Sequence, residues 1–389
     1  MKYQHVCIES LGYTLPDEFV TSDWIEARLE PLYERLRLPQ GRLELMTGIR
    51  ERRMWPANTL PSRPSIASAA RALEASGIDR RRIGALVHGS VCRDFLEPAT
   101  ASRVHHELGL PANCLIYDVS NACLGILDGM VQVANMIELG QIEAGIVVGT
   151  ENARPLLETT IAALNSDQSL TRETVKLAVA SLTIGSGSAA VVLTHRAISR
   201  TGNRLLAAAA RAHTVAHTLC RSDRDQAAGH GMQPLMHTDS ERMMHEGIAA
   251  GVATFDSLLA ETGWSRDDVD TTFCHQVGVA HRKLMLEALG LVPARDFTTF
   301  ETLGNTGSVA LPLTMAMGIE AGHLAPDQHA ALLGIGSGIN VLMLAVDWQG
   351  VPAARNNPKL NHQDTKHTKE SADDAFDAVL DHGNIEVDQ

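Results

Sequence analysis

Aromatic residues are scarce in this chain of 389 residues, where four Trp, four Tyr and seven Phe make up 4% of the sequence. A core with so few large side chains must be packed from small residues and closely spaced backbone, as where helices are buried between sheets. The chain also lacks an apolar run of the ~18–20 residues that a membrane-spanning helix requires. Its first residues, Met1 to Cys7, lack the apolar stretch of a signal peptide.

Basic residues are fewer than acidic ones: the chain has 33 Lys and Arg against 46 Asp and Glu, which gives a formal net charge of −13. Nucleic acids and anionic membranes are bound by clustered Lys and Arg, so neither is an expected partner. The cysteines have no paired spacing, which argues against a disulfide framework and favours the cytoplasm. We expect a functional cysteine to act as a thiolate. The six cysteines are Cys7, Cys92, Cys114, Cys123, Cys220 and Cys274.

Two pairs of matching segments indicate an internal duplication. Residues 73–83 (LEASGIDRRRI) match residues 259–269 (LAETGWSRDDV), and both read as a helix end, a glycine and the start of a strand. Residues 184–193 match residues 335–344, and both read as a glycine turn that leads into an apolar strand. Because the two matches occur in the same order, we predict that one α/β unit is present twice.

The repeat predicts the fold class and the domain organisation. We expect an α/β fold of two duplicated halves, residues 1–195 and 196–349, in a layered arrangement of helices and sheets. From Gly350 the chain becomes polar, with four basic and eight acidic residues up to Gln389. This composition is typical of a flexible tail, so residues 350–389 form a third, acidic region.

Short, unbroken apolar runs predict buried strands, and the longer segments between them predict helices. The predicted strands are residues 83–87, 115–119, 144–148, 189–193, 271–274 and 341–345. The predicted helices are residues 65–76, 124–139, 240–262 and 308–321.

Cys123 is the first candidate for chemistry, in the motif Asp118-Val-Ser-Asn-Ala-Cys123. It follows a predicted strand and stands at the first turn of a long apolar helix. The helix N–H groups and the positive end of the helix dipole are expected to lower the pKa of its thiol and to bind a developing oxyanion. The alternative is a buried cysteine that acts only as a small apolar residue.

Two polar residues of the second half complete the pattern. His275 stands at the end of the predicted strand 271–274, and Asn305 stands in the glycine-flanked turn Leu303-Gly-Asn-Thr-Gly307. A neutral imidazole and a carboxamide that converge on one carbonyl oxygen would stabilise an enolate. Taken singly, His275 could be a core histidine and Asn305 a turn or cap residue.

Four motifs, in this order on a duplicated α/β scaffold, resemble the thiolase superfamily and, within it, the condensing enzymes of the ketoacyl synthase III type. They are Asn-Ala-Cys123, His275-Gln, Gly-Asn305-Thr-Gly and Gly-Ile-Gly-Ser337-Gly. Each motif alone is weak, whereas the ordered set is specific and covers residues 1 to about 349. The resemblance implies a thiolase-like fold and an acyltransferase of lipid metabolism that uses acyl-CoA as substrate, with no cofactor and no metal.

A narrower similarity is to the condensing enzymes that join two fatty acyl-CoA molecules head to head at the start of bacterial olefin and β-lactone pathways. It rests on residues 93–102, 118–123 and 331–340, and Glu97 is the discriminating residue. A synthase whose nucleophile is an ordinary acyl-CoA must remove an α-proton, and a carboxylate suits that task. The resemblance implies a homodimer in which Glu97 enters the partner's active site. By residue type alone, Glu97 is a surface carboxylate before a proline.

The resemblance also implies a role for each residue. Cys123 takes the acyl group of the first acyl-CoA, while the backbone amides of Cys123 and Ser337 hold the oxyanion. His275 and Asn305 then bind the thioester oxygen of the second acyl-CoA, Glu97 removes its α-proton, and the carbanion attacks the acyl-cysteine. The product is a 2-alkyl-3-ketoacyl-CoA or, after hydrolysis, a β-keto acid. Two alternatives stay open: a decarboxylating 3-oxoacyl-[acyl-carrier-protein] synthase III with a malonyl donor, and a non-catalytic partner subunit.

Three further signals receive structural interpretations. A histidine-rich run has spacing that zinc could use but lacks a convincing fourth ligand, so we expect no metal. Residues 334–338 approach a dinucleotide-binding fingerprint, but a strand follows them where that fingerprint needs a helix. The arginines of residues 50–53 and 80–82 are interpreted as solvated loop charges, with CoA phosphates as an alternative partner for some. The histidine-rich run contains His213, His217, Cys220, His230 and His237.

Overall fold

The computed structural model describes residues 1–222 and 235–350. His230 and residues 351–389, which make up almost all of the predicted tail, lie outside the described residues. Within the described part of the chain, no helix is both long and apolar enough to cross a membrane.

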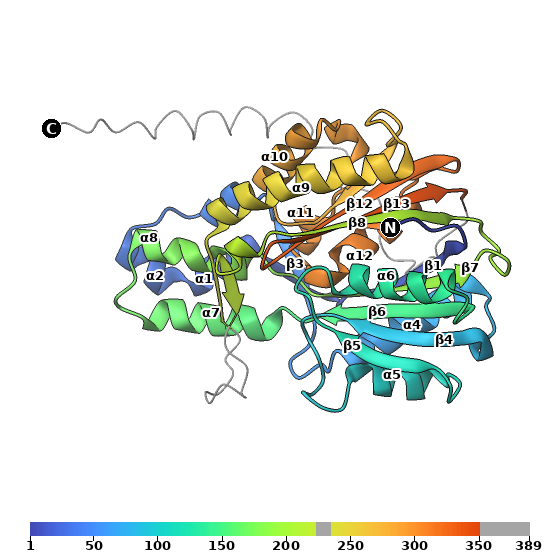
Figure 1. The fold of residues 1–389 in the computed structure, drawn as a ribbon. Coiled ribbons are helices and arrows are strands. Elements are labelled where there is room, and N and C mark those ends of the chain that lie inside the picture. The colour runs from blue at the N-terminus through green and yellow to red at the C-terminus, as the bar shows by residue number, and fades with distance from the viewer. Residues whose placement is uncertain (223–234, 351–389) are drawn as a thin grey trace. The chain divides into compact units, whose positions relative to one another are not determined.

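The main sheet has nine strands in the order β11-β12-β13-β8-β1-β7-β6-β4-β5, and its two halves meet where β1 pairs with β8 (Figure 1). The strands of the first half are β1 (Val6–Thr14), β4 (Ile83–Gly89), β5 (Leu115–Val119), β6 (Ala144–Glu151) and β7 (Gly187–His195). The strands of the second half are β8 (Arg204–Ala212), β11 (Thr271–Cys274), β12 (Gln328–Gly336) and β13 (Asn340–Trp348). The predicted boundary between the halves falls in the connection from β7 to β8.

The two halves repeat the same pairing outward from the contact between β1 and β8. In the first half, β1, β7 and β6 pair antiparallel, and β6, β4 and β5 pair parallel. In the second half, β8, β13 and β12 pair antiparallel, and β12 and β11 pair parallel. A single parallel bridge from Thr272 to Asp296 stands where the fifth strand would be. The matching sequence segments fall on β7 and β13, and on the helix ends before β4 and β11, so the predicted duplication is confirmed.

Helices cover both faces of each half. α4 (Ser62–Ser76) and α5 (Thr100–Leu108) form one core with the first half, and α9 (Ser240–Thr262) and α10 (Val279–Leu289) form another with the second. α6 (Gly125–Glu138) and α12 (Ala310–Glu320) share a central core with strands of both halves. Figure 1 shows α9 running along β12 and β13, and α6 running along β6. This arrangement confirms the predicted layers of helices and sheets.

Glycines allow the central helix α6 to lie close to the strands. A Cβ at Gly129 would lie 2.6 Å from Cγ1 of Val147, and a Cβ at Gly145 would lie 2.6 Å from Cγ1 of Val133. At distances this short a side chain at either glycine would force its neighbours to shift. The expectation of a core packed from small residues and close backbone is therefore confirmed.

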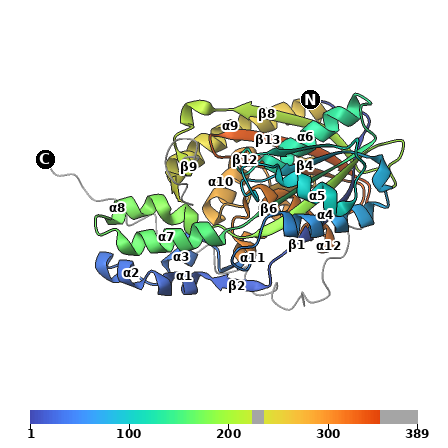
Figure 2. The same cartoon turned by 90° about the horizontal axis from the view of Figure 1, so that it is seen from below.

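A group of helices stands beside the main sheet and has its own apolar core (Figure 2). The group consists of α1 (Ser22–Arg28), α2 (Glu30–Leu36), α3 (Arg42–Thr47), α7 (Arg154–Ser166) and α8 (Arg172–Val175). A short hairpin of β2 (Glu18–Thr21) and β3 (Glu51–Met54) leads into it, and α11 (Phe300–Leu303) packs against β3.

Arg52 corrects the prediction that residues 50–53 are solvated loop charges. It lies on β3, is fully buried, and its guanidinium donates to Oγ of Ser22 and to the carbonyl oxygen of Leu182 at 3.1 Å each. Burial lowers its pKa to about 10. The prediction was wrong because this segment pairs with β2 and is covered by the helices, which its local composition does not reveal.

Candidate active site

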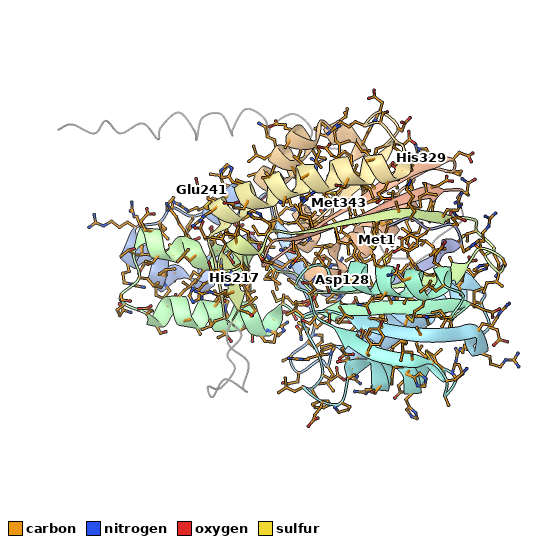
Figure 3. All side chains as sticks on the ribbon, viewed as in Figure 1. Met1, Asp128, His217, Glu241, His329 and Met343 are labelled. Atoms are coloured by element: carbon orange, nitrogen blue, oxygen red, sulfur yellow. The ribbon has the colours of Figure 1, made fainter. Side chains whose placement is uncertain are left out.

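Cys123 lies where β5 passes into α6, just before the N-cap residue Leu124. Ala122 has a φ of +47°, a left-handed value that is strained for a residue with a Cβ and that occurs often at functional sites. The side chain of Asn121 donates to Asp128 at 2.7 Å, and Figure 3 shows Asp128 at the start of α6. This turn holds Cys123 half-buried at the beginning of the helix.

The prediction of a lowered pKa for Cys123 is wrong. Burial raises the pKa of its thiol to about 12, and the nearby Glu151 and Cys220 raise it further. Burial is the largest cause of this rise, because a thiolate removed from water loses its solvation. At neutral pH Cys123 is a thiol, and it must lose its proton before it can act as a nucleophile.

His275 directly follows β11, and its backbone N–H donates to the carbonyl oxygen of Leu333 on β12 at 3.1 Å. The residue is 5% exposed. Burial lowers its pKa to about 3, and His281 on α10 lowers it further, so the imidazole is neutral at pH 7. Its Nδ1 has no hydrogen-bond partner within the described residues. A neutral imidazole suits the role predicted for it, because it can donate a hydrogen bond without carrying charge.

Gln276 connects His275 to the segment that carries Asn305. Its side-chain oxygen accepts hydrogen bonds from the backbone N–H groups of Thr299 at 3.0 Å and Phe300 at 3.2 Å. These two residues begin α11, and the Asn305 turn follows that helix. The His275-Gln motif therefore does two tasks, because its second residue fixes the position of the loop that supplies the amide.

Asn305 lies in the turn between α11 and the short helix η6 (Gly307–Val309), which leads into α12. Its backbone is fixed from both sides, since its N–H donates to Thr183 at 2.9 Å and its carbonyl accepts from Gly185 at 2.9 Å. The side-chain oxygen accepts from the backbone N–H of Gly307 at 3.0 Å. The carboxamide is thereby oriented, and among the described residues no hydrogen bond occupies its NH2 group, the donor that the prediction requires.

Close backbone contacts bring the end of β12 to the Cys123 turn. A Cβ on Gly336 would lie 3.1 Å from Cγ of Leu124 and 3.6 Å from the carbonyl oxygen of Asn121. β11 pairs with β12 on its other side, and His275 leaves β11 at this same end. His275 and Cys123 therefore border the same end of β12.

The Asn305 turn reaches Cys123 along a different route. Oγ of Ser308, three residues after Asn305, lies 3.0 Å from the carbonyl oxygen of Gly89 at the end of β4. A Cβ on Gly89 would lie 2.4 Å from the carbonyl oxygen of Gly125, two residues after Cys123. The structure thus brings the predicted nucleophile and the two predicted neutral donors together where the strands β4, β11 and β12 end.

Ser337 lies in the turn between β12 and β13, where Gly338 has a φ of +80°. A strand follows this turn, as the sequence analysis expected, so residues 334–338 do not form a dinucleotide-binding loop. The turn begins directly after Gly336 and so lies next to the residues around Cys123. The role of the Ser337 amide as an oxyanion donor stays a prediction.

Glu97 is the predicted site residue that the single chain does not bring to the others. It is exposed on the loop between β4 and α5. In the described part of the chain, it forms no hydrogen bond or ion pair with Cys123, His275 or Asn305.

Sequence reasoning missed Glu151, a carboxylate that is 5% exposed at the end of β6. Its Oε1 accepts hydrogen bonds from Oγ of Ser308 at 2.6 Å and from the backbone N–H of Val91 at 3.0 Å. Burial raises the pKa of Glu151, although these hydrogen bonds act to lower it. The available signal was an acidic residue at the end of an otherwise unbroken apolar strand.

The described residues of the histidine-rich run have other partners or lie apart. Nε2 of His213 lies 2.9 Å from the Glu246 carboxylate, and Cys220 accepts a hydrogen bond from Thr238. Among residues 1–222 and 235–350, no group of three or more His, Cys, Asp or Glu could hold a metal ion.

Comparisons with known proteins identify the family. The model of the thiolase N-terminal domain matches residues 64–230, and that of the 3-oxoacyl-[acyl-carrier-protein] synthase III C-terminal domain matches residues 259–348. The acyl-CoA:acyl-CoA alkyltransferase of Shewanella oneidensis is 42% identical over 351 residues, which cover 90% of this chain and 100% of that protein. The protein of the same name from Xanthomonas campestris is 34% identical over 348 residues, with coverage of 90% and 100%. The chain belongs to the acyl-CoA:acyl-CoA alkyltransferase family.

Solved structures of this alkyltransferase family share the fold. The OleA protein of Xanthomonas campestris with bound lauric acid and lauroyl-CoA is 33% identical to this chain, with a TM-score of 0.83. The match covers 89% of this chain and 100% of that one. Further structures of the same OleA carry substitutions of a glutamate, a cysteine or a histidine. The thiolase-like fold of the alkyltransferase family is therefore also the fold of this chain.

Proposed function

We propose that the protein joins two fatty acyl-CoA molecules head to head, in a Claisen condensation without decarboxylation. One observation carries this proposal: in a member of the alkyltransferase family, Cys123, His275 and Asn305 come together where strands of the sheet end. The OleA structure with lauroyl-CoA supports a fatty acyl-CoA as the substrate.

The first half-reaction forms an acyl-enzyme on Cys123. The thiol loses its proton and its sulfur attacks the thioester carbonyl of the first acyl-CoA, while the backbone amides of Cys123 and Ser337 hold the oxyanion. The intermediate collapses to S-acyl-Cys123 with loss of the CoA thiolate, which takes up the proton that the Cys123 thiol gave up. Because burial raises the pKa of the thiol to about 12, the resting group is the neutral thiol, and its proton has to leave during this half-reaction.

The second half-reaction forms the carbon–carbon bond. His275 and Asn305 donate hydrogen bonds to the thioester oxygen of the second acyl-CoA, and a carboxylate removes its α-proton. The α-carbon then attacks the acyl carbonyl, the bond to the Cys123 sulfur breaks, and the thiolate regains the proton. The product is a 2-alkyl-3-ketoacyl-CoA, which water can hydrolyse to CoA and a β-keto acid.

We assign the carboxylate to Glu97 of a second copy of the chain. β5 is the edge strand of the sheet, and an exposed edge is a template for pairing with another chain. Large apolar side chains are exposed on the Glu97 loop itself, where Val91, Phe95 and Leu96 are 51%, 57% and 51% exposed, and Leu115 at the start of β5 is 52% exposed. Exposed apolar side chains on this loop support an interface that would cover it.

Incubation of the purified protein with myristoyl-CoA alone tests the proposed function. We expect free CoA and, after the β-keto acid loses carbon dioxide, a long-chain ketone. A 3-oxoacyl-[acyl-carrier-protein] synthase III, which the match over residues 259–348 leaves as the alternative, would give product only with a malonyl donor. A non-catalytic subunit would give none with either donor. Product that depends on malonyl would overturn the proposal.

Mixing two inactive variants tests the position of Glu97. Cys123→Ala lacks the nucleophile and Glu97→Gln lacks the base, but a mixed dimer has one site with both groups intact if the base comes from the partner. Random exchange of subunits should therefore restore up to about a quarter of the normal activity in a twofold-symmetric dimer. If Glu97 serves its own chain, mixing restores nothing.

A further inference from the structure

Two of the three residues assigned to the second half-reaction, Asn305 and Glu97, lie on separate segments, and one buried carboxylate is hydrogen-bonded to both of these segments. We propose that Glu151 is a positioning residue for the second half-reaction, which fixes the Asn305 turn and the start of the Glu97 loop against each other beside Cys123. This inference rests on the proposed function, since that function assigns Asn305 and Glu97 to the condensation.

The Glu151 carboxylate contacts the Asn305 turn directly. Its Oε1 accepts from Oγ of Ser308 at 2.6 Å and lies 3.4 Å from the backbone nitrogen of the same residue. A Cβ on Gly307 would lie 3.1 Å from Cγ of Glu151, so the turn closes directly over this side chain. The backbone N–H of Gly307 in turn holds the side-chain oxygen of Asn305. A shift of Glu151 would therefore be passed to the amide that binds the enolate oxygen.

The same carboxylate holds the beginning of the Glu97 loop. The backbone N–H of Val91 donates to Oε1 at 3.0 Å, and that of Cys92 donates to Oε2 at 3.4 Å. The sulfur of Cys92 also accepts from the backbone N–H of Asn152, the residue after Glu151, at 3.4 Å. The loop is thus fixed where it leaves β4, while Glu97 stands further along it.

Both the charge and the shape of Glu151 matter to this contact. A carboxylate offers two acceptor oxygens, whereas the amide of a glutamine has one oxygen and must turn an NH2 group toward donors on one side. In Glu151→Gln the amide oxygen can keep the place of Oε1, with its bonds to Ser308 and Val91. The NH2 group then faces the backbone N–H of Cys92, which Oε2 accepts from at 3.4 Å, so the hold on the start of the Glu97 loop weakens at nearly unchanged volume. The negative charge also raises the pKa of the Cys123 thiol, so its removal should lower that pKa. A purely structural role would not produce this second effect.

The test compares the two half-reactions in the full-length Glu151→Gln protein. Acyl-enzyme formed from myristoyl-CoA is followed by intact-protein mass, and condensation is followed by ketone yield. We expect acyl-enzyme formation to be retained and condensation to fall on the order of 10- to 100-fold, the effect of misplacing reacting groups by about 1 Å. The pH profile for alkylation of Cys123 by iodoacetamide should move to lower pH.

Glu9→Gln is the matched control. Glu9 is also a buried carboxylate on a strand, 3% exposed, but it accepts from Arg200 and Ser199 at 2.9 and 2.7 Å instead of from site segments. Its substitution should change neither half-reaction nor the alkylation profile. Ser308→Ala removes one donor to Glu151 and should show the same imbalance in weaker form, which keeps the test decisive if Glu151→Gln fails to fold.

Two results would overturn the inference while the proposed function stands. One is an equal loss of both half-reactions in Glu151→Gln and Ser308→Ala, and the other is full condensation in both variants. An alkylation profile that does not move in Glu151→Gln would remove the electrostatic part of the case. Failure of the unsubstituted protein to condense two acyl-CoA molecules would instead overturn the proposed function, and this inference with it.

Discussion

The two halves of the sheet have the same topology but carry different chemistry. Cys123 precedes the central helix of the first half, and Asn305 precedes that of the second. At the end of the parallel strand that follows the outer helix, the first half has Ser90 and the second has His275. Both halves place these positions where strands end, so the repeated topology supplies equivalent positions that carry different side chains in the two halves.

The electrostatics of the halves differ in the same way. The first half supplies the buried carboxylate Glu151 and a thiol whose pKa burial raises to about 12. The second half supplies His275, whose pKa burial lowers to about 3, and the uncharged Asn305. Neutral donors oriented in a buried site can stabilise a developing negative charge without holding a charge of their own before the reaction. Because the halves supply different groups, substituting one site residue in each half tests their separate roles.

Cys123→Ala and Asn305→Ala should break the two half-reactions differently, and this is the largest effect that we expect. Loss of the nucleophile should abolish acyl-enzyme formation and condensation together, by on the order of 10³-fold or more. Loss of the amide donor should leave acyl-enzyme formation intact and slow condensation by ~10²- to 10³-fold. Intact-protein mass and ketone yield separate the steps. Full activity of Cys123→Ala, or equal loss of both steps in Asn305→Ala, would contradict the assignment.

Much of the fold could be predicted because local signals end its elements. The predicted helix 240–262 has the observed bounds of α9, because the Asp239 side chain caps one end and Gly263 adopts a φ of +78° at the other. The strands β1, β8 and β12 were not predicted. β1 contains the buried Glu9, β8 is rich in alanine, and β12 contains Gly334. Neighbouring strands, and not the local composition, keep these segments extended.

The site was only partly predictable for a related reason. Cys123, His275 and Asn305 stand in short motifs beside strand ends or turns, so sequence order alone grouped them. Glu151 was missed because its partner Ser308 is 157 residues away along the chain. The rise in the pKa of Cys123 was missed for the same reason, since burial and the Glu151 charge come from segments far away in sequence. Charged residues that long-range contacts bury are the ones that local patterns do not find.

The close approach at the centre of the first half can be tested against the looser packing of α9 in the second. A Cβ on Gly149 would lie 2.3 Å from the carbonyl oxygen of Gly89, whereas a Cβ on Gly247 in α9 would have only Cγ2 of Ile335 nearby, at 3.6 Å. Gly149→Ala should lower the free energy of unfolding by ~1–3 kcal/mol. Gly247→Ala should leave it unchanged or raise it by up to ~1 kcal/mol, since alanine favours a helix. Urea unfolding measures both, and similar values would show that the central packing is not tight.

Mild acid should destabilise the protein through histidines that burial keeps neutral, and near pH 6 this is the smallest effect that we expect. Burial lowers the pKa of His275 to about 3 and that of His281 to about 4, from 6.5 for an ordinary histidine. Below pH ~6.5 the unfolded chain binds protons that the folded chain does not, so stability falls as pH falls, by up to ~1.4 kcal/mol per pH unit for each histidine. Above that pH these groups contribute nothing.

Because His281 has a buried Nδ1 without a partner among the described residues, His281→Gln should remove its share of the slope between pH 6.5 and 5. An unchanged slope in urea unfolding would show that His281 can gain a proton in the folded protein. The surroundings of His281 would then be too exposed to water to keep a histidine neutral.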